Sequence, residues 1–130
     1  MTLLFIYGTL MPGLRLQAEM HGANFVGAAQ VPGRLVDVGC FPGLLPGDGQ
    51  VTGEVYEVDD AHLARLDVVE GMVPGDPDAS QYWRETVTVL SGQLQAQQVQ
   101  TYVYNRPVDA CVPISHGVYR RYIREVGRES

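Results

Sequence analysis

A glutamate, Glu70, stands where a helix would normally carry an apolar residue. Residues 61–70 read as a helix, and at roughly 100° per residue Glu70 falls within about 40° of Leu63 and Leu66. It also lies in the last helical turn, where the helix dipole disfavours a negative charge. Partial burial would raise the pKa of this carboxyl and suit it to general acid/base catalysis near neutral pH. If the helix instead frays by Val69, Glu70 simply points into solvent.

A second chemical feature is the tetrapeptide that ends the first apolar run, Tyr7-Gly8-Thr9-Leu10. The run before it reads as a buried strand, and a turn after it leads to a predicted short helix over 14–20. A strand, a glycine turn and a helix start leave several backbone N–H groups unpaired and pointing one way. Such a loop can hold a carboxylate or a phosphate. The plain alternative is a tight turn leaving a core strand.

Other combinations of reactive residues carry less weight. Cys111 and His116 could be drawn as a thiol nucleophile and its base, but nothing in the sequence orients the histidine. The three histidines show no paired metal-ligand spacing, and the paired aspartates lack the spacing of a calcium loop. We therefore expect neither a metal nor a cofactor.

The composition is that of one acidic globular domain over residues 1–130. A net charge of −6, with no basic run, argues against nucleic acid and anionic membranes as partners. The first apolar run is too short for a signal peptide or a transmembrane helix. Cys40 and Cys111 lie far apart in no metal or redox spacing, so we expect free thiols and a cytoplasmic protein.

Short strands joined by turns are expected, because 15 glycines and 8 prolines are spread along the chain. The predicted strands are 3–7, 25–30, 34–38, 51–58, 82–90 and 95–104. The last two form a hairpin across Ser91-Gly92, and neither face of its first arm is plainly polar. This pattern is typical of a small barrel covered by helices. The stretches 43–50 and 71–81 are expected to be loops.

Two further helices should cover the strands. Asp59 or Asp60 is expected to cap the helix that carries Glu70, and Gly71 to end it. We expect His62 to be exposed in its first turn. Ser115 is expected to cap the last helix, which ends at Gly127 and has an apolar stripe of Val118, Tyr119, Tyr122, Ile123 and Val126.

Together these features resemble the γ-glutamylcyclotransferase-like proteins, most closely the γ-glutamylamine cyclotransferase (AIG2-like) branch. The resemblance covers most of the chain and rests on the order and spacing of several motifs. In chain order they are Leu4-Phe5-Ile6-Tyr7-Gly8-Thr9-Leu10 with Gly13, Phe41-Pro42-Gly43-Leu44, Val51–Val58, Leu66-Asp67-Val68-Val69-Glu70-Gly71, Tyr82-Trp83-Arg84 and Tyr102-Val103-Tyr104. The resemblance implies an α+β fold, a small mixed β-barrel flanked by a few short helices, with one active site and no metal.

The resemblance also implies a reaction and a catalyst. In such enzymes the α-amine of a γ-glutamyl group attacks its own γ-carbonyl, and 5-oxoproline leaves together with the amine beyond the γ-bond. No nucleophilic side chain is needed, because the enzyme has only to orient the chain and move a proton. The resemblance assigns the proton transfers to Glu70.

The resemblance further implies which residues contact the small γ-glutamyl substrate. The backbone N–H groups of the loop would hold its α-carboxylate or its γ-carbonyl oxygen. The residues concerned are Tyr7, Gly8, Thr9 and Leu10. Tyr104, and less directly Tyr82, Arg84 and Tyr119, would line the pocket. Each tyrosine could equally pack the barrel with its hydroxyl bonded at the rim.

Three functions remain open at this point. The first is an active cyclotransferase that takes a γ-glutamyl amine, amino acid or peptide. The second is a non-catalytic binding module for a γ-glutamyl-like or acidic metabolite, and the third is a hydrolase that releases glutamate. Glu70 favours the first, because binding an α-carboxylate gains nothing from a second carboxylate nearby. Neither the leaving group nor the oligomeric state follows from the sequence.

The leaving group has one candidate determinant in the loop after Glu70. Asp76 and Asp78 lie there and could favour a cationic leaving group, such as a lysine side chain or a polyamine. The plain alternative is a solvated turn rich in Asp and Pro.

Overall fold

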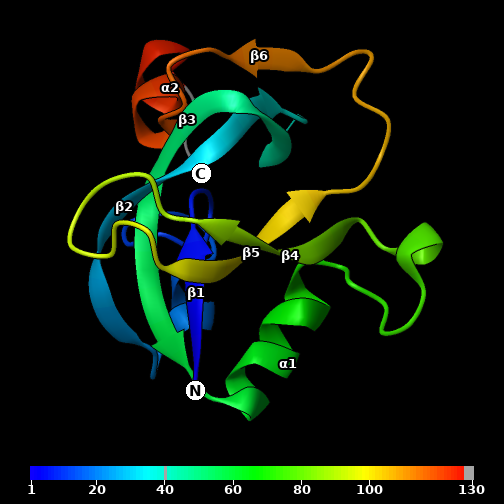
Figure 1. Cartoon of the computed structure of the whole chain (residues 1–130). Coiled ribbons are helices and arrows are strands. Elements are labelled where there is room, and N and C mark those ends of the chain that lie inside the picture. Colours follow the sequence, from blue (N-terminus) through cyan, green and yellow to red (C-terminus); the bar gives the residue numbers. More distant parts are fainter. Residues whose placement is uncertain (40, 128–130) are drawn as a thin grey trace.

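A curled, mixed β-sheet forms the frame of the protein. The computed structural model describes residues 1–39 and 41–127. The strands are β1 (Thr2–Ile6), β2 (Asn24–Asp37), β3 (Pro42–Val58), β4 (Tyr82–Thr88), β5 (Gln98–Tyr104) and β6 (Val112–Ile114), and their order across the sheet is β4-β5-β1-β3-β2-β6. β3 also pairs with β5, through Leu44 and Val103, so the sheet curls into a half-barrel (Figure 1). The α+β fold with a mixed barrel-like sheet is thereby confirmed.

Two short α-helices flank this sheet at opposite ends (Figure 1). They are α1 (Asp60–Val69) and α2 (Tyr119–Glu125). The chain also contains two short 3-10 helices, η1 (Gln17–Met20) and η2 (Pro77–Ala79). Leu66 on α1 and Tyr119 on α2 are both fully buried against the core. Within the described ranges, no helix has the length and apolar character needed to span a bilayer.

The start and end of α1 are as predicted. The Asp59 carboxylate accepts a hydrogen bond from the His62 backbone N–H at 2.7 Å, which satisfies one of the unpaired donors of the first turn. Gly71 follows the helix at φ +71°, a conformation that glycine adopts without steric cost. Glu70 lies between them as the C-cap residue, with its N–H bonded to the Leu66 carbonyl.

The predicted loop 43–50 is wrong, because these residues belong to β3. β2 and β3 form one long antiparallel hairpin, in which 24–32 pair with 50–57 and 34–37 pair with 42–45. Only residues 46–49 bulge out, between the two paired parts. The two predicted strands 25–30 and 34–38 are likewise one strand, because the chain continues through a bulge near Gly33 instead of turning.

The predicted helix over 14–20 is wrong over most of its length. Only its last turn is helical, as η1, because Gly13 adopts φ +81° and the Leu16 N–H bonds back to the Thr9 carbonyl at 2.8 Å. This bond folds the residues after Gly13 back onto the loop that ends at Leu10. Arg15 immediately precedes Leu16, the residue that makes the bond.

Three smaller predictions also need correction. β4 and β5 do pair, but their connection is longer than Ser91-Gly92, because the Leu90 N–H leaves the hairpin for the Gln30 carbonyl. Ser115 does not cap α2, whose N-cap is Val118. His62 is buried, with 4% of its surface exposed, because its Nε2 hydrogen-bonds the backbone oxygen of Glu19 at 2.7 Å. Cys40 lies outside the described residues.

Candidate active site

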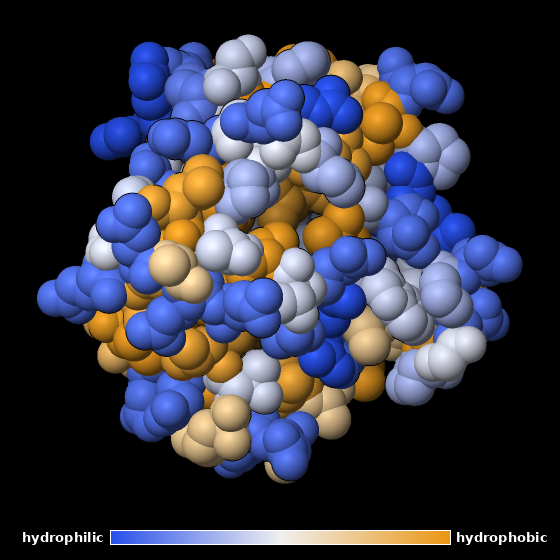
Figure 2. Space-filling model, viewed as in Figure 1, coloured by the Kyte–Doolittle hydropathy of each residue, from blue (hydrophilic) through white to orange (hydrophobic). Residues whose placement is uncertain are grey.

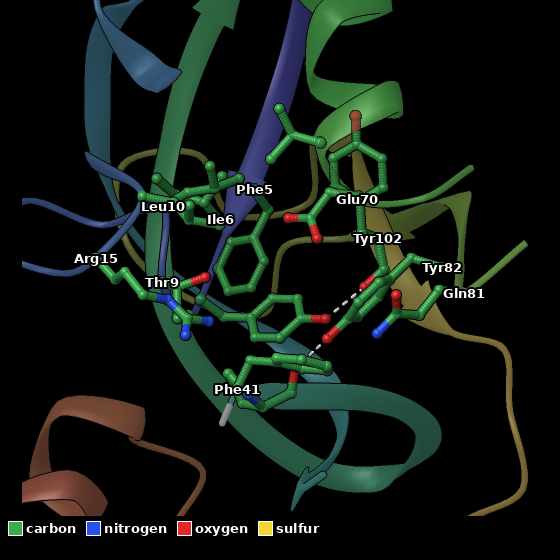
Figure 3. A pocket seen from close by; sticks show the side chains of 15 residues that line it. Phe5, Ile6, Thr9, Leu10, Arg15, Phe41, Glu70, Gln81, Tyr82 and Tyr102 are labelled. Carbon is green, nitrogen blue, oxygen red and sulfur yellow. Dashed lines mark hydrogen bonds between the residues drawn. The ribbon is translucent and has the colours of Figure 1, made fainter. Parts of the chain in front are cut away.

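A pocket opens where the end of β1, the end of α1 and the start of β4 meet. It encloses about 150 Å³, room for a compact head group rather than a polymer. Its lining is mainly apolar and aromatic, with few polar groups. The lining residues are Phe5, Ile6, Tyr7, Gly8, Thr9, Leu10, Arg15, Leu16, Phe41, Pro42, Val69, Glu70, Gln81, Tyr82 and Tyr102 (Figure 3). Figure 2 shows hydrophobic residues between hydrophilic ones at the centre of one face, where the surface is hollowed.

Glu70 points into this pocket from the end of α1, so its position matches the one inferred from the apolar stripe (Figure 3). Its neighbours in the lining include the apolar side chains of Phe5, Ile6 and Val69. Burial raises the pKa of Glu70 from 4.5 to about 7. Among the described residues its carboxylate has no ion-pair or hydrogen-bond partner. The group is therefore poised to take up and release a proton near neutral pH.

The raised pKa of Glu70 predicts a stability cost that grows with pH. In the unfolded chain Glu70 ionises near 4.5, and in the folded protein near 7. At a pH below both values the Glu70 carboxyl is protonated in both states, so its burial as a charged group does not lower the stability of the folded protein. Between the two values only the unfolded state ionises, so the folded state loses stability as pH rises, and the cost is complete above about 7. Glu70→Gln should therefore be more stable than the wild type by about 1–3 kcal/mol at a pH near 8.

Urea unfolding of both proteins across the pH range measures this effect. The gap between variant and wild type should shrink toward zero near pH 4, where Glu70 is protonated in both states. A gap that stays constant with pH would show that the carboxyl titrates normally.

The loop Tyr7–Leu10, here called the donor loop, lines the pocket and contains unpaired backbone N–H groups. Its carbonyls at Gly8 and Thr9 accept from the Met11 and Leu16 N–H groups at 3.0 and 2.8 Å. Within residues 1–39 and 41–127, the N–H groups of Gly8, Thr9 and Leu10 have no such partner, although all three residues are buried. Buried, unpaired donors are costly, which favours a ligand that accepts from them.

Gly8 is required by a close approach of two chain segments at the donor loop. A Cβ at this position would lie 2.6 Å from the Pro42 Cγ, closer than packed atoms allow. A larger residue would push the donor loop away from the Phe41-Pro42 segment that forms the other wall of the pocket.

Tyr7 and Tyr82 form a rigid wall, because their hydroxyls are already used in the fold. Tyr7 donates to the Tyr102 carbonyl at 2.6 Å and accepts from the Leu44 N–H at 3.1 Å. Tyr82 donates to the Pro42 carbonyl at 2.6 Å. Burial, and then the negative charge of Glu70 or of other tyrosines, raises the pKa of both phenols, so they remain neutral.

A partly buried ion pair lies behind the pocket wall. The guanidinium of Arg84 donates two hydrogen bonds to the Asp67 carboxylate, from Nε at 2.8 Å and from Nη2 at 3.2 Å. The Tyr102 hydroxyl donates to the same carboxylate at 2.6 Å. Tyr102 also lines the pocket, whereas Asp67 and Arg84 do not. The two charged residues therefore hold one wall of the site in place from behind.

The predicted site residues divide into two groups. Glu70, the donor loop and Tyr82 come together at the pocket. Arg84, Tyr104 and Tyr119 do not contribute to its lining. Arg84 is held by Asp67, Tyr104 packs edge-on against Tyr82 with ring centroids 5.3 Å apart, and Tyr119 is fully buried in α2.

Several lining residues were missed in the sequence, above all Arg15 and Gln81. Arg15 reaches the pocket only because the segment after the donor loop folds back, which the predicted helix over 14–20 concealed. Gln81 ends a predicted loop and carries no signal of its own. Asp76 accepts from the Ala79 N–H as the cap of η2, and it is not among the lining residues.

The other reactive groups show no arrangement that suggests chemistry. His116 contacts Glu125 through Nε2 at 2.9 Å, and no contact joins it to Cys111 in the described part of the chain. No group of three or more potential metal ligands occurs among the residues that the structure describes.

Comparisons with known proteins point in one direction. The family described as gamma-glutamyl cyclotransferase, AIG2-like, matches residues 4–121. The chain is 32% identical over 115 residues to the γ-glutamylcyclotransferase family protein YtfP of Escherichia coli K12, covering 88% of this chain and 92% of that protein. It is 35% identical over 105 residues to the γ-L-glutamyl-butirosin B γ-glutamyl cyclotransferase of Niallia circulans, covering 79% and 67%. An AIG2-like protein from Mus musculus superposes with a TM-score of 0.79 at 29% identity, covering 100% and 95%.

Proposed function

Because the chain belongs to the gamma-glutamyl cyclotransferase, AIG2-like family, we propose that it releases 5-oxoproline from a γ-glutamyl amine, amino acid or peptide. One observation carries the proposal: a carboxyl with a raised pKa and a loop with unpaired backbone donors line the same small pocket. The name of the Niallia circulans relative supports a γ-glutamyl compound as the substrate class.

The first step in this proposal is proton removal by Glu70. Its carboxylate takes a proton from the α-ammonium of the bound substrate, which frees the nitrogen lone pair. The small pocket holds the γ-glutamyl chain folded, so that the α-nitrogen lies against its own γ-carbonyl carbon. The new C–N bond then closes a five-membered ring. Negative charge on the carbonyl oxygen, or on the α-carboxylate, is met by the N–H groups of the donor loop.

Collapse of the tetrahedral intermediate breaks the original γ-amide C–N bond. Glu70 returns its proton to the departing nitrogen, so one carboxyl acts first as base and then as acid. Overall the α-nitrogen loses two protons and the departing nitrogen gains two. Glu70 carries the first, the second passes from the ring nitrogen to the released amine through solvent, and Glu70 ends in its starting state. The reaction needs no metal, redox cofactor or covalent enzyme intermediate. We also expect it to take place in the cytoplasm.

The experiment is a product assay over a panel of γ-glutamyl compounds. γ-Glutamyl-ε-lysine, γ-glutamyl-alanine, a γ-glutamyl-polyamine and glutathione are incubated with the protein, and 5-oxoproline and glutamate are both quantified. Release of 5-oxoproline supports the proposal, whereas glutamate alone would indicate a hydrolase. Binding without either product would indicate a binding module. The rates for lysine and alanine also test whether Asp76 and Asp78 favour a cationic leaving group.

A further inference from the structure

Arg15 is the only cationic side chain among the described residues that line the pocket, and Glu70 is the only anionic one. In the view of Figure 3 the two charged groups lie on either side of the Phe5 ring, and the Arg15 guanidinium lies beside Thr9 of the donor loop. A chain with a net charge of −6 therefore places an isolated positive charge at one end of this pocket.

The segment that carries Arg15 is held in place by its backbone. The Leu16 N–H bonds to the Thr9 carbonyl at 2.8 Å, which brings the residue after Arg15 onto the donor loop. The turn before it is fixed at Gly13, whose N–H donates to the Gln17 side chain at 2.8 Å. Arg120 of α2 adds a hydrogen bond to the Pro12 carbonyl. The position of Arg15 is thus a consequence of the fold.

The Arg15 side chain is free to bind a ligand. It is exposed, and it has no hydrogen-bond or ion-pair partner within residues 1–39 and 41–127. Arg15 shares the pocket lining with Gly8, Thr9 and Leu10, whose buried N–H groups are unpaired, and its guanidinium lies beside Thr9 in the view of Figure 3. A guanidinium in the same pocket as unpaired backbone donors is suited to a planar anion with two oxygens, such as a carboxylate.

We propose that Arg15 binds the α-carboxylate of the γ-glutamyl substrate, together with the donor loop. This inference rests on the function proposed above. The α-carbon of the substrate bears both the amine and the carboxylate, and the amine must face Glu70. Because the carboxylate and Glu70 repel each other, the carboxylate turns away from Glu70, toward the end of the pocket that Arg15 occupies. Arg15 is then a substrate-binding residue that positions the amine for proton transfer.

The test compares substrates with and without the α-carboxylate. Arg15→Gln should raise KM for a γ-glutamyl substrate about tenfold and change kcat by less than about threefold, because the charged pair acts equally in the ground and transition states. For the matching α-carboxamide substrate, Arg15→Gln should change neither constant. Arg15→Lys keeps the positive charge but lacks the planar guanidinium. Its KM for the carboxylate substrate should lie between those of the wild type and of Arg15→Gln. Arg65→Gln, at an exposed position of α1, is the matched control for net charge.

Binding of the product gives a readout that does not depend on turnover. 5-Oxoproline keeps the α-carboxylate and has no leaving group, so Arg15→Gln should weaken its binding about tenfold in calorimetry, and should leave binding of the 5-oxoproline carboxamide unchanged. If the wild type binds 5-oxoproline in this Arg15-dependent way but turns over no substrate, the proposed function fails while this inference holds.

Three results would overturn the inference. The first is an Arg15→Gln effect of equal size on carboxylate and carboxamide ligands, which would mean that Arg15 only supports the loop. The second is an Arg15→Gln effect that is present for γ-glutamyl-alanine, whose leaving group carries a carboxylate, and absent for a γ-glutamyl-alkylamine, whose leaving group carries none. Absence of 5-oxoproline binding to the wild type would contradict it equally.

Discussion

Glu70→Gln is expected to lower kcat/KM for 5-oxoproline formation by about a thousandfold. The amide has the size and shape of the carboxyl but can neither accept the α-ammonium proton nor return it to the departing nitrogen. The pocket and the donor loop remain, so substrate orientation should still give some acceleration over the reaction in water. Most of the loss should appear in kcat, because the missing proton transfers belong to the chemical step, whereas KM loses only the contact between Glu70 and the α-ammonium.

Two controls make this result specific. Glu85→Gln, at an exposed position of β4, carries the same charge change and should keep wild-type activity. Glu70→Gln itself should be folded and, at a pH near 8, more stable than the wild type, which separates lost catalysis from lost structure. Activity within about tenfold of the wild type would mean that another group moves the proton.

Asp67→Ala is expected to destabilise the protein by about 3–4 kcal/mol, the largest stability effect that we predict. The substitution leaves the half-buried Arg84 without its carboxylate partner, and the Tyr102 hydroxyl without its acceptor. The cost arises from the unpaired charge, so the double variant Asp67→Ala with Arg84→Met should recover part of the lost stability. Urea unfolding of the single and double variants measures both effects.

An exposed ion pair in the same protein provides the comparison. Arg121 and Glu125 lie on the surface of α2, 3.1 Å apart, and Arg121→Gln should change the free energy of unfolding by less than about 0.5 kcal/mol. If Asp67→Ala costs no more than Arg121→Gln, then the buried network does not support the pocket wall, and our account of Tyr102 is wrong.

The central features of the candidate site could be predicted from the sequence because they depend on residues that are close together in the chain. Glu70 violates the apolar pattern of the predicted helix, and α1 begins after the predicted cap Asp59 and ends before the predicted stop Gly71. The donor loop follows from the strand that precedes it and from the glycine within it. These signals depend on residues a few positions apart, so periodicity and turn chemistry are enough to read them.

The remaining features depend on contacts between distant residues. His62 has the position of an exposed helix residue, yet it is buried because Glu19 of η1 lies against it. Arg15 enters the pocket because the Leu16 N–H bonds to Thr9 instead of starting a helix. Neither contact leaves a periodic pattern. The start of β3 was missed for a similar reason. The glycines and Pro46 of 43–50 read as a turn, whereas β2 and β5 pair with this stretch as a strand.

The most direct test of the central claim is product analysis in heavy-oxygen water with a turned-over γ-glutamyl substrate. Intramolecular attack by the α-amine predicts one equivalent of 5-oxoproline for each equivalent of released amine, with no heavy oxygen in the product. Water attack would instead give glutamate that carries one heavy oxygen atom. Unlabelled 5-oxoproline as the sole glutamyl product would support cyclisation in this pocket, and labelled glutamate in its place would contradict it.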